Sequence, residues 1–520
     1  MRPERCPLRA PYLMLAALLV SLVSLRAGAA PVQPAPVIIG TTGGDVSGSG
    51  GEVLTFKGIP YAAAPTGPLR WGAPQPPPAW PGVRDATRFG DDCMQTPYVI
   101  PTGQKASEDC LTVSVWTPAH ARGARRPVMV FIYGGAFIGG SCAYPLYDGT
   151  RLAAQGVVVV CFNYRVGIFG FFAHPMLSAE SPQRSSGNYG LLDQLAALKW
   201  VRANIAAFGG DPHRVTVFGE SAGAVSIAVL MTSPLAQGLF AQAILQSPVV
   251  APLATLDVAE KSGASLAADV TALRDLSAAQ LLAHNVDFFP RTASDLLAVA
   301  FPAPILDGYV VPLQPRTAFR RGAVHAVPSI VGINADEGRM FTGEETVAGY
   351  RAWVRDRFGP LAPDLPRLES GATDAAATTA ASALLGDAMF GESARLIARG
   401  IARRQPKTYA YVFSHSVAGR AQPATHSEEL PFVFGSLAQP SFVKHPAPDR
   451  SDLQLSATLL RTWARFAASG DPNGPGLARW PAYDRATESY LEFGTVIRAG
   501  RAWHQQQLDA LESFYADDQP

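Results

Sequence analysis

From residue 127 onward, short apolar runs alternate along the chain with segments whose apolar residues recur at helical spacing. The short runs are nearly continuous in Val, Ile and Phe, which is typical of strands buried on both faces of a parallel sheet. Six runs are predicted to be strands: Pro127–Tyr133, Val157–Asn163, Val215–Gly219, Ala241–Gln246, Pro328–Asn334 and Thr408–Ser414.

Helical patterns lie between these strands. Leu191–Ala207 has apolar residues at helical spacing, and Ser221–Thr232 is predicted to be a helix that follows a strand directly. Between Ala251 and Ala326, and again between Gly343 and Arg404, the pattern blurs into helices and loops before strands resume. Alternating strands and helices indicate crossover connections in one sheet. The predicted fold class is therefore α/β, with a large, mostly parallel central sheet, helices on both faces and helical insertions above it.

The N-terminus has the order of a secretory signal peptide. Arginines precede an apolar run, Tyr12–Leu25, and small residues follow it. The run is shorter than the roughly 20 residues that a membrane span needs. We expect cleavage after Ala29, a secreted or periplasmic protein without stable membrane insertion, and a single mature domain over residues 30–520. An uncleaved anchor is the alternative.

The composition indicates a globular protein and excludes one class of partner. The chain has 520 residues, of which 48% are apolar and 16% charged, so it can bury a large core. The formal net charge is +1, and no Lys/Arg block interrupts the body of the chain. Because nucleic-acid binding requires a basic stripe, no nucleic-acid partner is expected.

Four cysteines follow the predicted signal peptide. Cys93 and Cys110 bracket a short polar segment, as in a loop closed by a disulfide. Cys161 lies within an apolar run, where a thiol is usually a small buried hydrophobe. No spacing resembles a zinc site. We expect one disulfide, Cys93–Cys110, and expect Cys142 and Cys161 to be unpaired and inert.

The strongest chemical signal is Gly219-Glu220-Ser221-Ala222-Gly223, a G-x-S-x-G sequence between a predicted strand and a predicted helix. A strand that turns abruptly into a helix holds its serine in a strained conformation, and side chains two residues away would collide with neighbouring elements. The serine hydroxyl then stands clear at the N-terminal end of a helix. This context predicts Ser221 as a nucleophile rather than part of an ordinary tight turn.

A serine nucleophile needs a base and a group that orients the base, and in this fold they follow in the order Ser, Asp/Glu, His. Asp336 and Glu337 both follow a predicted strand, and position alone does not choose between them. His415 and His426 both follow the next strand, and His415 could equally be a structural cap.

The tetrahedral intermediate of acyl transfer needs backbone N–H donors for its oxyanion. One candidate is the amide of Ala222, directly after the nucleophile. Others are expected in the Gly-rich loop Tyr133-Gly134-Gly135-Ala136-Phe137, which follows an early strand. Small residues there let amides point freely at a substrate.

Ordered motifs along the chain carry a family resemblance. They are Phe56-Lys57-Gly58-Ile59-Pro60-Tyr61-Ala62, Ser107-Glu108-Asp109-Cys110-Leu111, Asn163-Tyr164-Arg165-Val166-Gly167, Gly187-Asn188-Tyr189-Gly190-Leu191-Leu192-Asp193-Gln194, Phe208-Gly209-Gly210-Asp211-Pro212 and the serine elbow. With them the chain resembles the type-B carboxylesterase/lipase family, which includes the cholinesterases and bacterial carboxylesterases. The resemblance covers essentially the whole mature chain and implies the α/β-hydrolase fold.

The resemblance also implies roles for particular residues. It assigns the acid to Glu337, the base to His426 and the oxyanion donors to Gly135, Ala136 and Ala222. It places the family's first disulfide on Cys93 and Cys110. The implied reaction is hydrolysis of small-molecule carboxylic esters through an acyl-enzyme, with no cofactor and no metal.

Some positions depart from the family pattern. Ala136 stands where many members have a third glycine, and its methyl group still leaves the amide free. Ser247, which tends to hydrogen-bond near the triad, precedes Pro248 where glycine is usual. The loop closed by Cys93 and Cys110 is shorter than in cholinesterases, and their choline-binding tryptophan has no match, so choline-ester specificity is not expected.

Other functions share much of this pattern. A lipase acting on long-chain esters would need an apolar lid, and a non-catalytic binding member would lack part of the triad; amidases and thioesterases use the same machinery. Glu220 is expected to modulate local electrostatics or to be structural, and Arg339 is a possible contact for an acidic substrate. Candidates for the acyl pocket, unless they are simply core, are Phe137, Phe288, Phe289 and Phe301.

Overall fold

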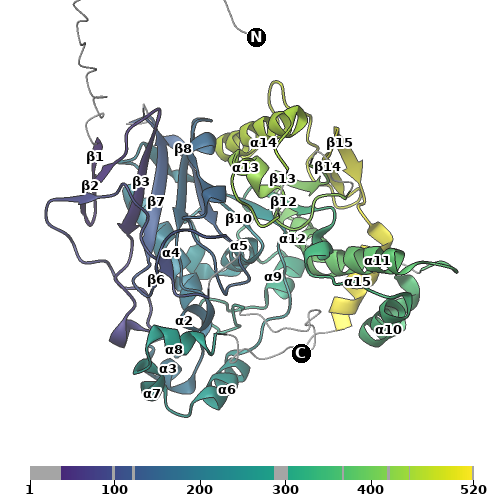
Figure 1. Cartoon of the computed structure of the whole chain (residues 1–520), viewed down its shortest axis with the longest axis horizontal. Helices are drawn as coiled ribbons and strands as arrows, with labels where there is room; N and C mark the ends of the chain where they lie inside the picture. Colours follow the sequence, from purple (N-terminus) through teal and green to yellow (C-terminus); the bar gives the residue numbers. More distant parts are fainter. Residues whose placement is uncertain are drawn as a thin grey trace, which may run out of the picture. The chain divides into compact units, whose positions relative to one another are not determined.

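A ten-stranded sheet organises the protein (Figure 1). The structure is a computed structural model that describes residues 37–517 except 97–99, 120–122, 286–302, 366–367, 418–421 and 444–445. The expected signal peptide and its cleavage site lie outside the described residues. No helix in the described ranges is long and apolar enough to cross a membrane.

The sheet is parallel in its centre and antiparallel at its edges. Its strands are, in spatial order, β3 (Val53–Pro60), β7 (Thr112–Pro118), β9 (Val158–Phe162), β8 (Arg126–Ile132), β10 (Gly210–Glu220), β11 (Gln242–Gln246), β12 (Ser329–Asn334), β13 (Thr408–Phe413), β14 (Ser489–Phe493) and β15 (Ile497–Arg501). Every neighbouring pair from β9 to β14 is parallel, whereas β7, β3 and β15 are antiparallel to their neighbours.

The six predicted strands are β8 to β13, so the predicted α/β class with a mostly parallel sheet is confirmed. All residues of β9, β11 and β12 are buried. Strands that bury both faces need an unbroken apolar sequence, which is why the pattern predicted them. Smaller strands lie outside the main sheet: β1 (Val37–Thr41), β2 (Gly44–Gly48), β4 (Val83–Asp85), β5 (Asp92–Cys93) and β6 (Ala106–Ser107).

Helices cover both faces of the sheet. Both predicted helices are present, as α4 (Tyr189–Asn204) and α5 (Ala222–Thr232). Helices α5 and α14 (Arg450–Ser469) both pack on β8 and β10 but not on each other, so they lie on opposite faces. Further helices around the sheet are α1 (Thr150–Ala153), α2 (Gly167–Phe171), α3 (Pro175–Glu180), α9 (Pro315–Arg321), α12 (Glu392–Ala402) and α13 (Leu430–Phe434).

The two blurred regions of the sequence form helical insertions. The first contains α6 (Leu256–Leu266), α7 (Val270–Arg274) and α8 (Ala278–Leu282), beside α3 in Figure 1. The second contains α10 (Val347–Phe358) and α11 (Asp374–Gly386), which share a small apolar cluster with α15 (Gln505–Asp517). A π-helical turn, Asp387–Gly391, joins α11 to α12.

The structure contains two disulfides. Cys93–Cys110 forms as expected. The expectation that Cys142 and Cys161 stay unpaired was wrong, because they form a second disulfide with their Cα atoms 5.8 Å apart. Cys161 lies on β9, inside the sheet, and Cys142 lies in the loop after the adjacent strand β8. The apolar sequence around Cys161 reflects a buried strand and carries no sign of a partner from another segment.

Candidate active site

The serine elbow joins β10 to α5. Ser221 has φ 54° and ψ −124°, a left-handed conformation that costs energy for any residue with a side chain. A Cβ on Gly219 would lie 2.6 Å from the carbonyl oxygen of Ile132 at the end of β8, and a Cβ on Gly223 would collide with that same oxygen. The two glycines are therefore required because the neighbouring strand ends against this turn.

The side chain of Glu337 is the carboxylate that faces the histidine. Glu337 opens a 3₁₀ turn, Glu337–Met340, after β12. Its Oε2 lies 2.6 Å from Nδ1 of His426, and its Oε1 accepts hydrogen bonds from the backbone N–H of Asn334 at 2.7 Å and from Ser247 Oγ at 2.5 Å. A buried carboxylate with these donors is held as an acceptor, which fixes the ring of His426. Ser247 thus bonds Glu337 although Pro248 follows it.

Asp336, the alternative acid, points elsewhere. Its carboxylate accepts hydrogen bonds from Ser382 Oγ at 2.6 Å and from Arg339 Nε at 3.1 Å. Arg339, considered as a contact for an acidic substrate, is therefore engaged in an ion pair with its own neighbour.

His415, the alternative base, also lies outside the site. Its Nε2 is 2.6 Å from Asp452 Oδ1. Asp452 forms a reciprocal capping box with Asp449 at the N-terminus of α14. His415 therefore bonds the N-terminal capping box of α14, in agreement with the interpretation of this histidine as a structural cap.

His426 is buried and is contacted on both ring nitrogens. Nδ1 meets Glu337, while Nε2 lies 3.1 Å from Oε1 of Glu220, the residue before the nucleophile. The aromatic rings of Phe341 and Phe390 pack on the imidazole with centroids 5.3 and 4.7 Å away. Within the described ranges, Ser221 Oγ makes no hydrogen bond to this imidazole; such bonds are often long in unliganded enzymes and tighten with substrate.

Three buried glutamates surround His426. Besides Glu337, they are Glu220, which accepts from Ser427 Oγ at 2.6 Å, and Glu429, which accepts from Gln246 Nε2 at 2.7 Å. Sequence reasoning missed Glu429, although it lies only three residues after His426.

The buried charges shift one another's pKa values. Burial raises the pKa of Glu220 and of Glu429, because it disfavours the charged carboxylate. Burial by itself lowers the pKa of His426, but the negative charges of Glu220 and Glu337 raise it by more, so that its pKa lies above the usual histidine value. The site therefore favours a protonated imidazole, the species that forms when His426 takes a proton.

The Gly-rich loop after β8 lies directly against the elbow. A Cβ on Gly134 would lie 3.0 Å from Cβ of Ser221. Gly135 and Ala136 have φ of 114° and 52°, so the loop bends sharply beside the nucleophile. In the part of the chain that the structure describes, no protein group accepts the backbone N–H of Gly135, Ala136 or Ala222. These amides are free to bind an anionic oxygen.

Of the four aromatic residues considered for the acyl pocket, the structure describes one, Phe137. Phe137 is buried and packs edge-to-face on Phe171 with ring centroids 4.9 Å apart. Phe288, Phe289 and Phe301 lie outside the described residues. Phe341 and Phe390, which sequence reasoning missed, are the rings that contact the histidine.

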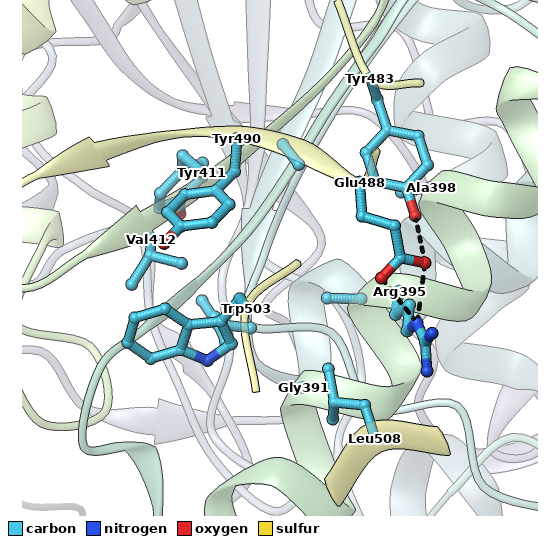
Figure 2. Close-up of a pocket in the computed structure, with 13 residues that line it drawn as sticks. Gly391, Arg395, Ala398, Tyr411, Val412, Tyr483, Glu488, Tyr490, Trp503 and Leu508 are labelled. Carbon is cyan, nitrogen blue, oxygen red and sulfur yellow. Dashed lines mark hydrogen bonds and ion pairs between the residues drawn. The ribbon is translucent and has the colours of Figure 1, made fainter. Parts of the chain in front are cut away.

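A separate apolar cavity of about 60 Å³ lies between α12, the strands β12 to β14 and α15 (Figure 2). Figure 2 shows Tyr490 and Trp503 on one side and Glu488, ion-paired with Arg395, on the other. Ligand pockets usually measure about 300–1,000 Å³, so this cavity is too small for an ester substrate. No candidate catalytic residue lines it.

Comparisons with known proteins agree with this architecture. The model of the carboxylesterase family matches residues 35–349 and 368–511. The chain is 44% identical to a fumonisin B1 esterase of Sphingopyxis macrogoltabida, over 88% of this chain and 87% of that one. It is 37% identical to the para-nitrobenzyl esterase of Bacillus subtilis, over 88% and 95%.

A solved structure and a mammalian relative extend the comparison. A PNB esterase structure matches with a TM-score of 0.78 and 34% identity, over 91% of this chain and 99% of that chain. Human cocaine esterase is 34% identical over 89% of this chain and 87% of its own length. The chain therefore belongs to the carboxylesterase family, has the α/β-hydrolase fold and is a carboxylic-ester hydrolase.

Proposed function

We propose that Ser221, His426 and Glu337 are the catalytic triad of this hydrolase, and that the amides of Gly135, Ala136 and Ala222 bind the oxyanion. The observation that carries the proposal is the 2.6 Å contact between His426 Nδ1 and Glu337 Oε2, which joins residues 89 positions apart. It forms where the serine elbow meets the loops after β12 and β13.

The first half-reaction acylates the serine. His426 Nε2 takes the proton of Ser221 as Oγ attacks the ester carbonyl, and the carbonyl π electrons move onto oxygen. The resulting oxyanion is bound by the three free amides. When the intermediate collapses, the C–O bond to the alcohol breaks and His426 returns the proton to the leaving alkoxide.

The second half-reaction frees the enzyme. A water molecule gives a proton to His426 and attacks the acyl carbon, and the same amides bind the new oxyanion. Collapse expels Ser221, which regains its proton from His426, and a carboxylic acid leaves. Glu337 holds Nδ1–H in both halves, so Nε2 remains the basic nitrogen.

The substrates that follow are small-molecule esters. Fumonisin B1 is the first natural ester to test as a substrate, because a fumonisin B1 esterase is 44% identical to this chain. We further propose that residues 1–29 are a cleaved signal peptide, that 30–520 form one domain and that the protein is secreted or periplasmic. Both disulfides support an oxidising compartment.

The experiment is hydrolysis of nitrophenyl esters of increasing acyl length by the mature chain and by Ser221→Ala. We expect turnover to fall by as much as about 10⁶-fold in the variant, with the fold unchanged by circular dichroism. Ser265→Ala, which alters an exposed hydroxyl on α6, is the matched control and should keep full activity. Labelling by a fluorophosphonate should map to Ser221.

Retained turnover in Ser221→Ala would exclude the triad. The acyl-length profile tests the alternative function: a maximum at short chains indicates an esterase, whereas a rate that rises with chain length and at an oil interface indicates a lipase.

A further inference from the structure

The turn that presents Gly135 and Ala136 is closed on itself. The backbone N–H groups of Ile138 and Gly139 both donate to the carbonyl of Gly135, at 3.0 and 3.2 Å. The turn is held from outside at the carbonyl of Phe137, which accepts the N–H of Gly167 at 2.6 Å, and at its end, Gly140, so the position of the free amides depends in part on how Gly140 is held.

Gln95 holds that end through both polar groups of its side chain. Its Nε2 donates to the carbonyl of Gly140 at 2.9 Å, and its Oε1 accepts the N–H of Gly140 at 2.8 Å. Nε2 also donates to the carbonyl of Cys93 at 3.0 Å. The side-chain amide of Gln95 therefore both donates to and accepts from the backbone of Gly140, as a residue of an adjacent strand would. Gln95 is buried.

Further hydrogen bonds and a disulfide hold the residues that follow. Ser141 Oγ donates to Asp92 and accepts the backbone N–H of Ala143 at 2.9 Å. Cys142 is joined to β9 by its disulfide. Gln95 and Asp92 lie on either side of Cys93, so both residues that bond Gly140 and Ser141 belong to the segment anchored by the Cys93–Cys110 disulfide.

We propose that Gln95 is a positioning residue for the oxyanion hole, acting through Gly140 on the amides of Gly135 and Ala136. The inference rests on the proposed function, because it needs those amides to bind the oxyanion. Among the described residues, Gln95 makes no hydrogen bond to the triad or to the three donors. Oxyanion donors must lie about 2.7–3.1 Å from the developing charge. A shift of about 1 Å in a positioned group can cost about 10²-fold in rate.

The test replaces Gln95 by methionine, which has a similar length and no amide. We expect Gln95→Met to lower kcat by about 10–100-fold while KM changes less than about threefold, since the lost interaction belongs to the transition state. Affinity for a trifluoromethyl ketone, whose adduct carries an oxyanion, should fall in parallel with kcat/KM. Gln75→Met, at an exposed glutamine whose side chain donates to the carbonyl of Ala73, is the matched control and should leave both unchanged.

Active-site titration with a nitrophenyl ester separates positioning from folding. A merely structural role would reduce the number of titratable serines and leave kcat per titrated site and ketone affinity at wild-type values, and this result would overturn the proposal. Ser141→Ala serves if Gln95→Met does not fold; we expect a smaller kcat loss with the same KM and ketone pattern. Unchanged kcat per site in this variant would also count against the proposal.

Failure of the proposed function shows itself differently. If fluorophosphonate does not label Ser221 in the wild type, the triad is wrong. If Ser221 is labelled and required but Gln95→Met has full kcat per site, only the positioning role is wrong.

Discussion

The two sides of the active site are held by different physical means. The side that carries the oxyanion loop and the elbow is built from left-handed backbone, close glycine contacts and two disulfides. The side that carries Glu337 and His426 is built from residues that follow β12 and β13, where Asn334 hydrogen-bonds two buried carboxylates, Glu337 and Glu429.

The difference teaches which changes each side tolerates. On the oxyanion side, the groups that would bind the oxyanion are neutral backbone amides, so geometry decides their effect. On the acid–base side, charge decides, because Glu220, Glu337 and Glu429 share a buried space with one imidazole. Variants that alter volume or covalent bonds should therefore act on the first side, and variants that alter charge should act on the second.

The largest effect should come from Glu337→Gln. The uncharged amide does not stabilise the imidazolium and can present its NH2 group to Nδ1, so His426 loses its tautomer and orientation, and kcat should fall by about 10³–10⁴-fold. Asp336→Asn is the matched control, since that carboxylate bonds Ser382 and Arg339 instead of the base. Steady-state kinetics on both variants decides: equal losses would show that the carboxylate facing His426 was misassigned.

The oxyanion side should respond next, to loss of the Cys142–Cys161 disulfide. A disulfide that closes a loop of about this length contributes about 3 kcal/mol to the free energy of unfolding. We expect a double Cys142→Ser/Cys161→Ser variant to unfold at lower denaturant concentration, with the pKa that governs its activity unchanged. An unfolding midpoint equal to that of the wild type would show that the bond adds nothing to the fold.

Ser247→Ala probes how firmly the acid is held. It removes the 2.5 Å hydrogen bond to Glu337 and leaves the bond from Asn334. A hydrogen bond to a charged group is worth about 1.5–3 kcal/mol and 1.4 kcal/mol is a factor of ten in rate, so kcat should fall by about tenfold. If the variant keeps the wild-type kcat, the backbone N–H of Asn334 is sufficient to hold Glu337 in position.

The smallest effect on maximal rate, and the clearest test of charge, is Glu220→Gln. The base must be neutral to act, so kcat/KM rises with pH through the pKa of His426 in the free enzyme. Glu220 helps to raise that pKa, and removing its charge lowers it. The rising limb of the pH profile should therefore move to lower pH. Glu492→Gln, at a carboxylate paired with Arg498, should leave the limb in place.

The sequence predicted the centre of the fold better than its edges, for a physical reason. Strands β8 to β13 are buried over most of their length, so each contains a nearly continuous apolar run. Strand β3, at one edge of the sheet, buries only two of its residues fully. Strand β14, which lies next to the other edge, alternates buried and partly exposed positions, and its sequence Ser489–Phe493 is short and mixed in polarity. Such segments form strands because an adjacent strand offers hydrogen-bond partners, and their own hydrophobic pattern does not predict this pairing.

The same distinction applies to the site. Ser221 was predictable because its strain imposes a local sequence, whereas the choice between Asp336 and Glu337 depends on which side chain turns inward after β12. Phe390 reaches His426 through the π-helical turn before α12, and no local motif marks that placement. Cys142 and Cys161 pair through the arrangement of adjacent strands, which the spacing of cysteines cannot reveal.

The short reach of the two disulfides has a consequence for the order in which this enzyme is made. Their partners lie 17 and 19 residues apart, and all four cysteines precede residue 162. A chain synthesised from its N-terminus has both pairs available before Ser221, Glu337 or His426 has been added. The covalent frame of the oxyanion turn can thus exist as a template in the growing chain, and the nucleophile, the acid and the base arrive at a surface that is already cross-linked.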